Sequence, residues 1–330
     1  MVYLDSLSQL KKDECIYLYG AGSFAKTFYS QLVHYRNDVK ILSFIDKTKR
    51  GELYNIEIIC PDDIPHNNKH KIIVCTSIDY WEDIHSSLGN GNTFINRFHD
   101  FNIYRRAHEI KNDKCLKRLF RNSLEINTLL NCIEDQNIQP LVESKGLVDG
   151  YNKFFERIKL KPSDVIINGG GANGSENDRF IEKIGSSGKI YTFDPNHNGK
   201  DLNRQIETHP YVLYNKSGSI KFCFDGSRSR VSRESGVSLD SVSVDEFICQ
   251  NKIEKLNLIR LDTEGAEKEI LIGARNSIKK FKPTLAICLY HSTADFFEIP
   301  TLINEICDGY KFDLGIYDCQ GIDTYLHAYL

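Results

Sequence analysis

The sequence has little net charge, no long apolar run and no clustered cysteines. Its 330 residues carry a formal net charge of -3, which provides no basic field for a phosphate backbone and argues against nucleic acid as a partner. No run of about 18 apolar residues is present, so no segment is predicted to span a bilayer. Residues 1–12 are too polar for a secretory signal, and we expect a cytoplasmic protein.

The cysteines exclude two further classes of protein. They are scattered from Cys15 to Cys319 without a zinc-binding spacing, so neither a disulfide framework nor a zinc site is predicted. With 41% hydrophobic and 26% charged residues, the composition is that of an ordinary globular protein and leaves a homo-oligomer open. The length favours two domains.

The first domain is predicted over residues 1–105. A short apolar run at 15–19 leads directly into Gly20, Ala21 and Gly22, and a helical pattern follows to about Arg36. Further strands are predicted at 39–45 and 71–76, which gives about three parallel strands in a doubly wound arrangement. Residues 106–160 show apolar residues at helical spacing and no strand signal, so they are predicted to form a helical connector.

The second domain is predicted over residues 161–330, where the alternation of strands and helices restarts. Five strands are predicted in the doubly wound part, at 165–167, 190–193, 211–214, 256–261 and 284–289. The last two apolar runs, 312–317 and 325–329, lie too close together for a crossover helix and should form an antiparallel hairpin. The predicted fold class is therefore α/β, with two Rossmann-like doubly wound domains.

A glycine loop in the second domain has the spacing of a nucleotide site. Its glycines are Gly169, Gly170, Gly171 and Gly174, preceded by Asn168 at the strand end. Glycines let a ligand approach the backbone where a helix N-terminus offers free N–H groups.

An acidic residue follows this loop at the end of the next strand. Asp194 lies 23 positions after Gly171 and can accept hydrogen bonds from ribose hydroxyls. The first domain repeats the pattern with Gly22 and Asp46, although a tight turn requires glycine even without a ligand. Spacing alone leaves both a nicotinamide cofactor and S-adenosylmethionine open.

Chemically active side chains follow the fourth and fifth predicted strands of the second domain. Asp262 and Glu264 come after one strand and His291 after the other. Because ligands bind at the carboxyl ends of parallel strands, these groups are candidates to remove a proton from a hydroxyl. Asp262 and Glu264 are also carboxylates of the kind that ligate Mg²⁺, and metal dependence stays open. We expect Glu267 and Glu269 on a solvated helix face.

Over about residues 162–330 the sequence resembles the FkbM family of methyltransferases. The resemblance rests on the segments 258–267 (LIRLDTEGAE), 271–274 (LIGA) and 287–291 (ICLYH), and on Asp295 with 298–300 (EIP). It implies a class I methyltransferase sheet ending in the hairpin, S-adenosylmethionine as cofactor, and O-methylation of a sugar hydroxyl in a bacterial glycan or nucleotide-linked sugar. Asn168 stands where the family usually has an acidic residue. Residues 17–64 resemble the small nucleotide-fold module of bacterial sugar acyltransferases.

The hypothesis is therefore an S-adenosylmethionine-dependent sugar O-methyltransferase of polysaccharide biosynthesis, in which His291 or Asp262 takes the hydroxyl proton. One alternative is a nicotinamide-dependent sugar oxidoreductase that uses the first loop, although no Tyr-x-x-x-Lys pair follows it. The other alternative is a non-catalytic nucleotide-binding or scaffold protein.

Overall fold

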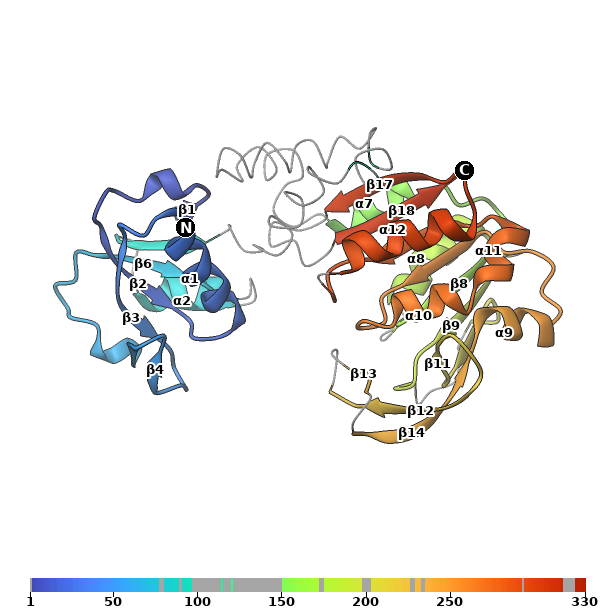
Figure 1. Ribbon diagram of the computed structural model, residues 1–330, viewed down its shortest axis with the longest axis horizontal. Helices are drawn as coiled ribbons and strands as arrows, with labels where there is room; N and C mark the ends of the chain where they lie inside the picture. Colours follow the sequence, from blue (N-terminus) through green and yellow to red (C-terminus); the bar gives the residue numbers. More distant parts are fainter. Residues whose placement is uncertain are drawn as a thin grey trace. The chain divides into compact units, whose positions relative to one another are not determined.

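The computed structural model describes residues 2–76, 80–88, 91–96, 114, 120, 150–171, 175–197, 203–225, 229–232, 235–292, 294–316 and 324–330. Two compact units are present, one built on strands β1–β7 and the other on strands β8–β18 (Figure 1). Each contains a mostly parallel sheet with helices, which confirms the predicted fold class. The boundaries 1–105, 106–160 and 161–330 stay a prediction, because most of the proposed connector lies outside the described residues.

The N-terminal unit is a seven-stranded sheet in the order β1-β7-β6-β2-β3-β5-β4, parallel except where β4 pairs with β5. Its elements are β1 (Val2–Leu4), β2 (Cys15–Tyr19), α1 (Ser23–Tyr35), β3 (Lys40–Ile45), β4 (Gly51–Leu53), β5 (Ile56–Ile59), β6 (Lys71–Val74), α2 (Trp81–Leu88) and β7 (Thr93–Asn96). The sequence predicted about three of these strands. The four missed strands, β1, β4, β5 and β7, have only three or four residues each and weak apolar patterns, so pairing with a neighbouring strand rather than local pattern defines them.

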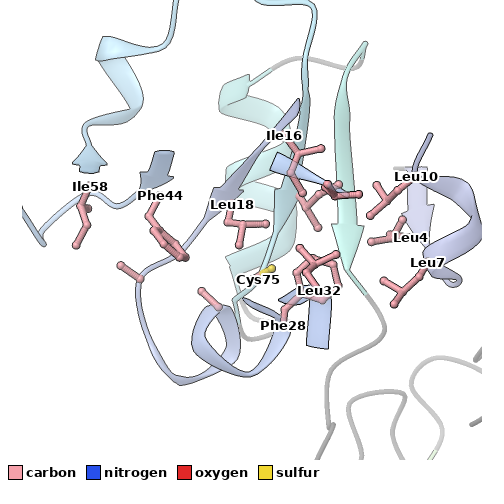
Figure 2. Close-up of a cluster of buried hydrophobic side chains, with 14 residues drawn as sticks. Leu4, Leu7, Leu10, Ile16, Leu18, Phe28, Leu32, Phe44, Ile58 and Cys75 are labelled. Carbon is pink, nitrogen blue, oxygen red and sulfur yellow. The ribbon is translucent and has the colours of Figure 1, made fainter. Parts of the chain in front are cut away.

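The core of the N-terminal unit lies between α1 and the sheet (Figure 2). Phe28 and Leu32 are four residues apart and therefore share one face of α1, where both are buried. They belong to the same cluster as Ile16 and Leu18 of β2 and Phe44 of β3. Burial of this face holds the Gly20 turn at the carboxyl end of β2.

The C-terminal unit has a seven-stranded sheet in the order β10-β9-β8-β15-β16-β18-β17. Its strands are β8 (Val165–Gly169), β9 (Lys189–Phe193), β10 (Ile206–His209), β15 (Leu258–Leu261), β16 (Thr284–Cys288), β17 (Lys311–Ile316) and β18 (Thr324–Tyr329). All neighbours are parallel except β16 with β18 and β18 with β17, so the predicted antiparallel hairpin is confirmed. Strand order reverses between β8 and β15, which places a switch point there.

Six helices of the described residues cover the C-terminal sheet (Figure 1). They are α7 (Gly150–Arg157), α8 (Ser175–Ile184), α9 (Val244–Gln250), α10 (Glu267–Ile272), α11 (Arg275–Phe281) and α12 (Asp295–Ile306). Phe154 and Phe155 of α7 and Phe180 of α8 are buried in one cluster with Ile166 of β8 and Leu258 of β15. Helix α12 packs against α10 and α11. None of the helices in the described ranges is long and apolar enough to cross a bilayer.

A small second sheet, β11-β14-β12-β13, lies between β10 and β15 in the sequence. Its strands are β11 (Val212–Leu213), β12 (Gly218–Cys223), β13 (Arg230–Val231) and β14 (Val237–Val242). The prediction that 211–214 forms a strand of the main sheet was wrong, because β11 pairs with β14 and the main-sheet strand is β10. Pro210 separates the two strands, and its missing N–H ends the pairing of β10.

Candidate functional site

A cavity of about 310 Å³ opens at the carboxyl ends of β8, β9 and β15. This volume is at the lower end of the range of ligand pockets. Gly170, Gly171 and Asp194 line one part of it, and Asp262 and Glu264 line another. The small sheet contributes apolar wall residues, namely Leu213, Phe222 and Val231. The topology therefore brings together two of the sequence-predicted groups, the glycine loop and the carboxylates after β15.

Two glycines of the loop are required by close packing. Gly170 has φ +78°, and a Cβ there would lie 1.8 Å from the backbone oxygen of Asp262. Gly169 ends β8, where a Cβ would lie 2.9 Å from the side chain of Leu261. Gly171 lines the cavity, whereas Gly169 does not. Gly174 lies outside the described residues.

Asp194 follows β9 and presents an unpaired oxygen. The residue is 5% exposed, and its Oδ1 accepts a hydrogen bond of 2.8 Å from the backbone N–H of Asn196. Its Oδ2 is buried without a hydrogen-bond partner among the described residues. A buried carboxylate oxygen normally has a partner, so this atom is suited to a ligand hydroxyl.

The corresponding carboxylate of the N-terminal unit is used by the protein itself. Asp46 accepts hydrogen bonds from the backbone N–H groups of Ala21, Thr48 and Lys49 at 3.0, 2.9 and 3.0 Å. Burial by itself would raise the pKa of Asp46, but these hydrogen bonds lower it. Both carboxylate oxygens therefore hold the turn together, which is the arrangement a purely structural loop requires.

Asn168 does not line the cavity but lies beneath the glycine loop, fully buried. Its Nδ2 donates to Oδ1 of Asn177 at 3.0 Å, and Nδ2 of Asn177 donates to Oγ1 of Thr192 at 3.0 Å. These residues lie side by side because Asn168 of β8 pairs in register with Thr192 of β9. Contact of Asn168 with a cofactor stays a prediction.

Arg260 is a buried cation that sequence reasoning did not select. It is 1% exposed, and its Nη2 lies 2.5 Å from Oε1 of Glu176 and 2.9 Å from Oδ2 of Asp262. Nη2 also lies 3.0 Å from the hydroxyl of Tyr325. An arginine in an otherwise apolar strand was a signal, because such a charge requires buried acidic partners.

Asp262 is held in its ionised form by neighbours on three strands. Oδ1 accepts from the Tyr290 hydroxyl at 2.9 Å, and Oδ2 accepts from the Tyr325 hydroxyl at 3.1 Å. Burial by itself would raise the pKa of Asp262, but the charges of Arg260 and His291 lower it below its ordinary value. The carboxylate is therefore charged and fixed in orientation at the cavity wall.

His291 lies behind this wall and faces three carboxylates. Its Nδ1 lies 2.9 Å from Oε1 of Glu267, and its Nε2 lies 3.4 Å from Oδ1 of Asp262 and 3.6 Å from Oε1 of Glu264. Burial by itself would lower the pKa of His291, but the carboxylates raise it from 6.5 to about 10. The imidazole does not line the cavity and, in this environment, retains its proton at neutral pH.

Glu267 is not on a solvated face, contrary to the expectation from sequence. It is 1% exposed, and its Oε1 also accepts from the backbone N–H and the hydroxyl of Thr263 at 2.7 and 3.0 Å. The charge of Glu267 predicted a solvated position, whereas it shares a face of α10 with the buried Ile270 and Leu271, and the end of β16 brings His291 over it. Glu269 is half-buried, and its Oε2 accepts a hydrogen bond from Nδ2 of Asn215.

Comparison with known proteins identifies the region that carries this site. Residues 169–329 match the methyltransferase FkbM domain. A stretch of 129 residues is 26% identical to the hexuronic acid methyltransferase AglP of Haloferax volcanii, covering 35% of this chain. The match spans 53%, about half, of the length of that relative.

A solved structure shares the fold. The crystal structure of methyltransferase FkbM from Methylobacillus flagellatus superimposes with a TM-score of 0.59 at 17% identity, covering 98% of this chain and 92% of that chain. At this identity the likeness concerns the fold alone. The family match over 169–329 shows that the C-terminal region is similar to the methyltransferase FkbM domain, and the solved structure shares its fold.

Proposed function

We propose that this protein transfers the methyl group of S-adenosylmethionine to a hydroxyl of a sugar. The FkbM domain supports the reaction class. The name of the curated relative, a hexuronic acid methyltransferase, supports a sugar acceptor. The proposal retains the cofactor and substrate class expected from the sequence and leaves the individual sugar open.

The buried, unpaired Oδ2 of Asp194 is the observation that carries the proposal. It lies at the wall of a cavity that Gly170 and Gly171 also line, so a ribose hydroxyl could donate to it while the loop backbone contacts the rest of the nucleoside. Tyr211 and Leu213 add apolar surface for the adenine ring on the same side. The first loop offers no equivalent oxygen, because both oxygens of Asp46 accept backbone hydrogen bonds. This contrast disfavours the nicotinamide alternative.

Asp262 and Glu264 are the groups that can meet the acceptor, since both line the cavity. In the proposed step the sugar oxygen attacks the methyl carbon, the carbon–sulfur bond breaks, and S-adenosylhomocysteine leaves as a neutral thioether. The hydroxyl proton passes to a carboxylate. Most of the rate acceleration would come from holding the oxygen in line with the methyl group.

The two candidate bases named from the sequence differ in their environment. His291 carries its proton at neutral pH while three carboxylates surround it, and it can then only orient Asp262 and Glu264. Asp262 is ionised and accepts hydrogen bonds from two tyrosines. We therefore assign the proton acceptor to the carboxylates and a positioning role to His291.

The experiment that tests the donor site is calorimetric titration of the full chain with S-adenosylmethionine. Asp194→Asn preserves shape but removes the charged acceptor, so affinity should fall by about 1.5 to 3 kcal/mol, or roughly 10- to 100-fold. Asp225→Asn, at an exposed carboxylate outside the cavity lining, is the matched control and should bind as the unaltered chain does.

Equal affinity of the Asp194→Asn variant would place the ribose elsewhere and remove the main support for the proposal. Methyl transfer itself is tested with isotopically labelled S-adenosylmethionine and a panel of hexose and hexuronic acid glycosides. Label in a methyl ether of the sugar is the expected product. Nucleotide binding by the N-terminal unit, its resemblance to sugar acyltransferase modules, and a cytoplasmic location stay predictions.

A further inference from the structure

We infer that Asp262, Glu264 and His291 form a binding site for a divalent cation beside the donor cavity. One ligand atom from each of these residues lies within 4.8 Å of the others. The two carboxylates come from the loop after β15 and the imidazole from the end of β16, which are neighbouring parallel strands. The role of the site in acceptor binding, described below, rests on the proposed function, whereas the existence of the site does not.

The orientation of the imidazole is the first argument. Oε1 of Glu267 lies 2.9 Å from Nδ1 of His291, and since a carboxylate oxygen can only accept, Nδ1 carries a hydrogen. A bound cation would displace the proton that Nε2 otherwise carries, and the neutral ring then presents a lone pair there. Nε2 makes no hydrogen bond within the described part of the chain, its side chain is 6% exposed, and it faces Asp262 and Glu264. Positive charge must lie between these three atoms, and either a proton on Nε2 or a metal ion can supply it.

The second argument is the balance of charge. Glu176, Asp262, Glu264 and Glu267 lie within one connected set of ion pairs, together with Arg260 and His291. Among the described residues, three carboxylates, Asp262, Glu264 and Glu267, surround His291, and of these only Asp262 has a further cationic partner, Arg260. Buried charges of one sign are costly without compensation, and a divalent ion supplies it.

Glu267 provides the third argument. A histidine that binds a metal through one nitrogen usually donates its other N–H to a carboxylate, which fixes the tautomer and strengthens the ligand. Glu267 holds His291 in this way, and the N–H and hydroxyl of Thr263 hold Glu267 in turn.

Two carboxylates and one imidazole suit Mn²⁺, which accepts both oxygen and nitrogen ligands. Mg²⁺ requires tighter octahedral geometry than this open set offers. The carboxylates also line the cavity, so the remaining coordination positions would face the acceptor. The acceptor class this implies is a sugar with two adjacent oxygen donors, either a vicinal diol or a hydroxyl beside a carboxylate. The cation would hold both oxygens and acidify the hydroxyl.

The test is a titration of the full chain with Mn²⁺ in the absence of donor and acceptor. Binding is measured as the loss of the free Mn²⁺ signal in electron paramagnetic resonance. We expect one Mn²⁺ per chain. Glu264→Asn should weaken binding about tenfold or more, because it shortens the side chain and removes a charged ligand. Asparagine tolerates the left-handed conformation, φ 54°, that Glu264 adopts, so this variant should fold. Glu298→Gln, at an exposed carboxylate paired with Lys268, is the control and should bind normally.

Absence of binding at about 1 mM Mn²⁺, or equal binding by the folded Glu264→Asn variant, would overturn the inference. The first result would mean that a proton alone occupies Nε2 of His291. Titration with S-adenosylmethionine in the presence of EDTA distinguishes this failure from failure of the proposed function. Donor binding without Mn²⁺ binding contradicts only the cation site, whereas Mn²⁺ binding without donor binding contradicts only the proposed function.

Discussion

At the scale of the residue, Asn168 is a buried amide that has polar neighbours at both its nitrogen and its oxygen. Its Nδ2 donates a hydrogen bond to Oδ1 of Asn177, and its Oδ1 lies 3.4 Å from Nη1 of Arg260. A carboxylate at this position would lose the donor, but the amide of Asn177 can rotate and donate instead. Thr192 can then donate its hydroxyl to Asn177, because a hydroxyl serves as donor or acceptor.

We therefore predict that Asn168→Asp folds and keeps its affinity for S-adenosylmethionine within a few fold. The added charge lies beside Arg260, so the free energy of unfolding should change by no more than about 1 kcal/mol. Urea denaturation and calorimetric titration measure the two quantities. Asn168→Leu is the contrasting variant, since it leaves Asn177 without its partner and should be clearly less stable. Loss of donor binding in a folded Asn168→Asp protein would indicate that the amide itself contacts the cofactor.

At the scale of the element, the turn from β8 to α8 depends on the absence of a side chain. Gly170 combines φ +78° with a Cβ position 1.8 Å from the backbone oxygen of Asp262. Neither a rotamer change nor movement of a flexible side chain can relieve a contact with backbone. A side chain at position 170 would therefore force the backbone of the turn or of the end of β15 to move.

Gly170→Ala should lower the free energy of unfolding by about 2 kcal/mol or more, and should also shift Asp262 and reduce donor affinity. The comparison is Gly22→Ala in the first glycine loop, where a Cβ would meet nothing within 4 Å. That variant should change stability by less than about 1 kcal/mol. Chemical denaturation of both variants checks the prediction, and a tolerated alanine at position 170 would contradict the geometry of the turn.

Strand β18 carries a buried histidine that makes the C-terminal unit sensitive to acid. His327 is 3% exposed and packs against the rings of Phe154 and Tyr325. Burial, with a smaller effect of Arg157, lowers its pKa from 6.5 to about 3. The unfolded chain therefore binds a proton below about pH 6.5 that the folded chain does not bind, and stability is lost as the pH falls from there towards 3.

His327→Gln removes this titration. The free energy of unfolding of the unaltered chain should fall between about pH 7 and pH 4. The fall in the variant should be smaller by about 2 to 3 kcal/mol. Urea midpoints at several pH values measure the difference, each protein being referred to its own value at neutral pH. His34→Gln, at an exposed position, should follow the unaltered chain. Parallel pH profiles for His327→Gln and the unaltered chain would show that His327 titrates normally.

At the scale of the whole molecule, helix α7 bears on where the C-terminal domain begins. It lies within the predicted connector 106–160, yet Phe154, Phe155 and Ile158 are 4%, 2% and 2% exposed in the cluster that includes Phe180. Phe120 is likewise buried and its ring centroid lies 6.2 Å from that of Phe312. Each large apolar side chain buried in this way contributes about 1.5 to 3 kcal/mol.

We predict that a fragment of residues 109–330 folds and binds S-adenosylmethionine with the affinity of the full chain. A fragment of residues 161–330, which begins at the boundary expected from the sequence, should lose several kcal/mol and melt at a lower temperature. Thermal denaturation and calorimetric titration of both fragments provide the test. Equal melting temperatures would mean that α7 is dispensable and that the domain begins at residue 161.

The sequence by itself determined the parts of this protein that local pattern encodes. Strands β2, β3, β8, β15 and β16 are predominantly apolar segments, and such segments are typically buried. The glycine turn of β8, the carboxylate after β9 and the final hairpin follow from short spacings. The doubly wound class and the site edge were therefore predictable.

Only the tertiary structure decided which charged groups meet. Arg260 and Glu176 are 84 positions apart, and strand order brings them together. The charge of Glu267 predicted a solvated position, yet the residue is buried and the end of β16 covers it with His291. The spacing of apolar residues predicts which face of a helix or strand is buried. It does not predict which charged residue of another element packs against that face. A buried ion pair depends on that neighbour, because desolvation of a charge is offset only by a partner that the topology supplies.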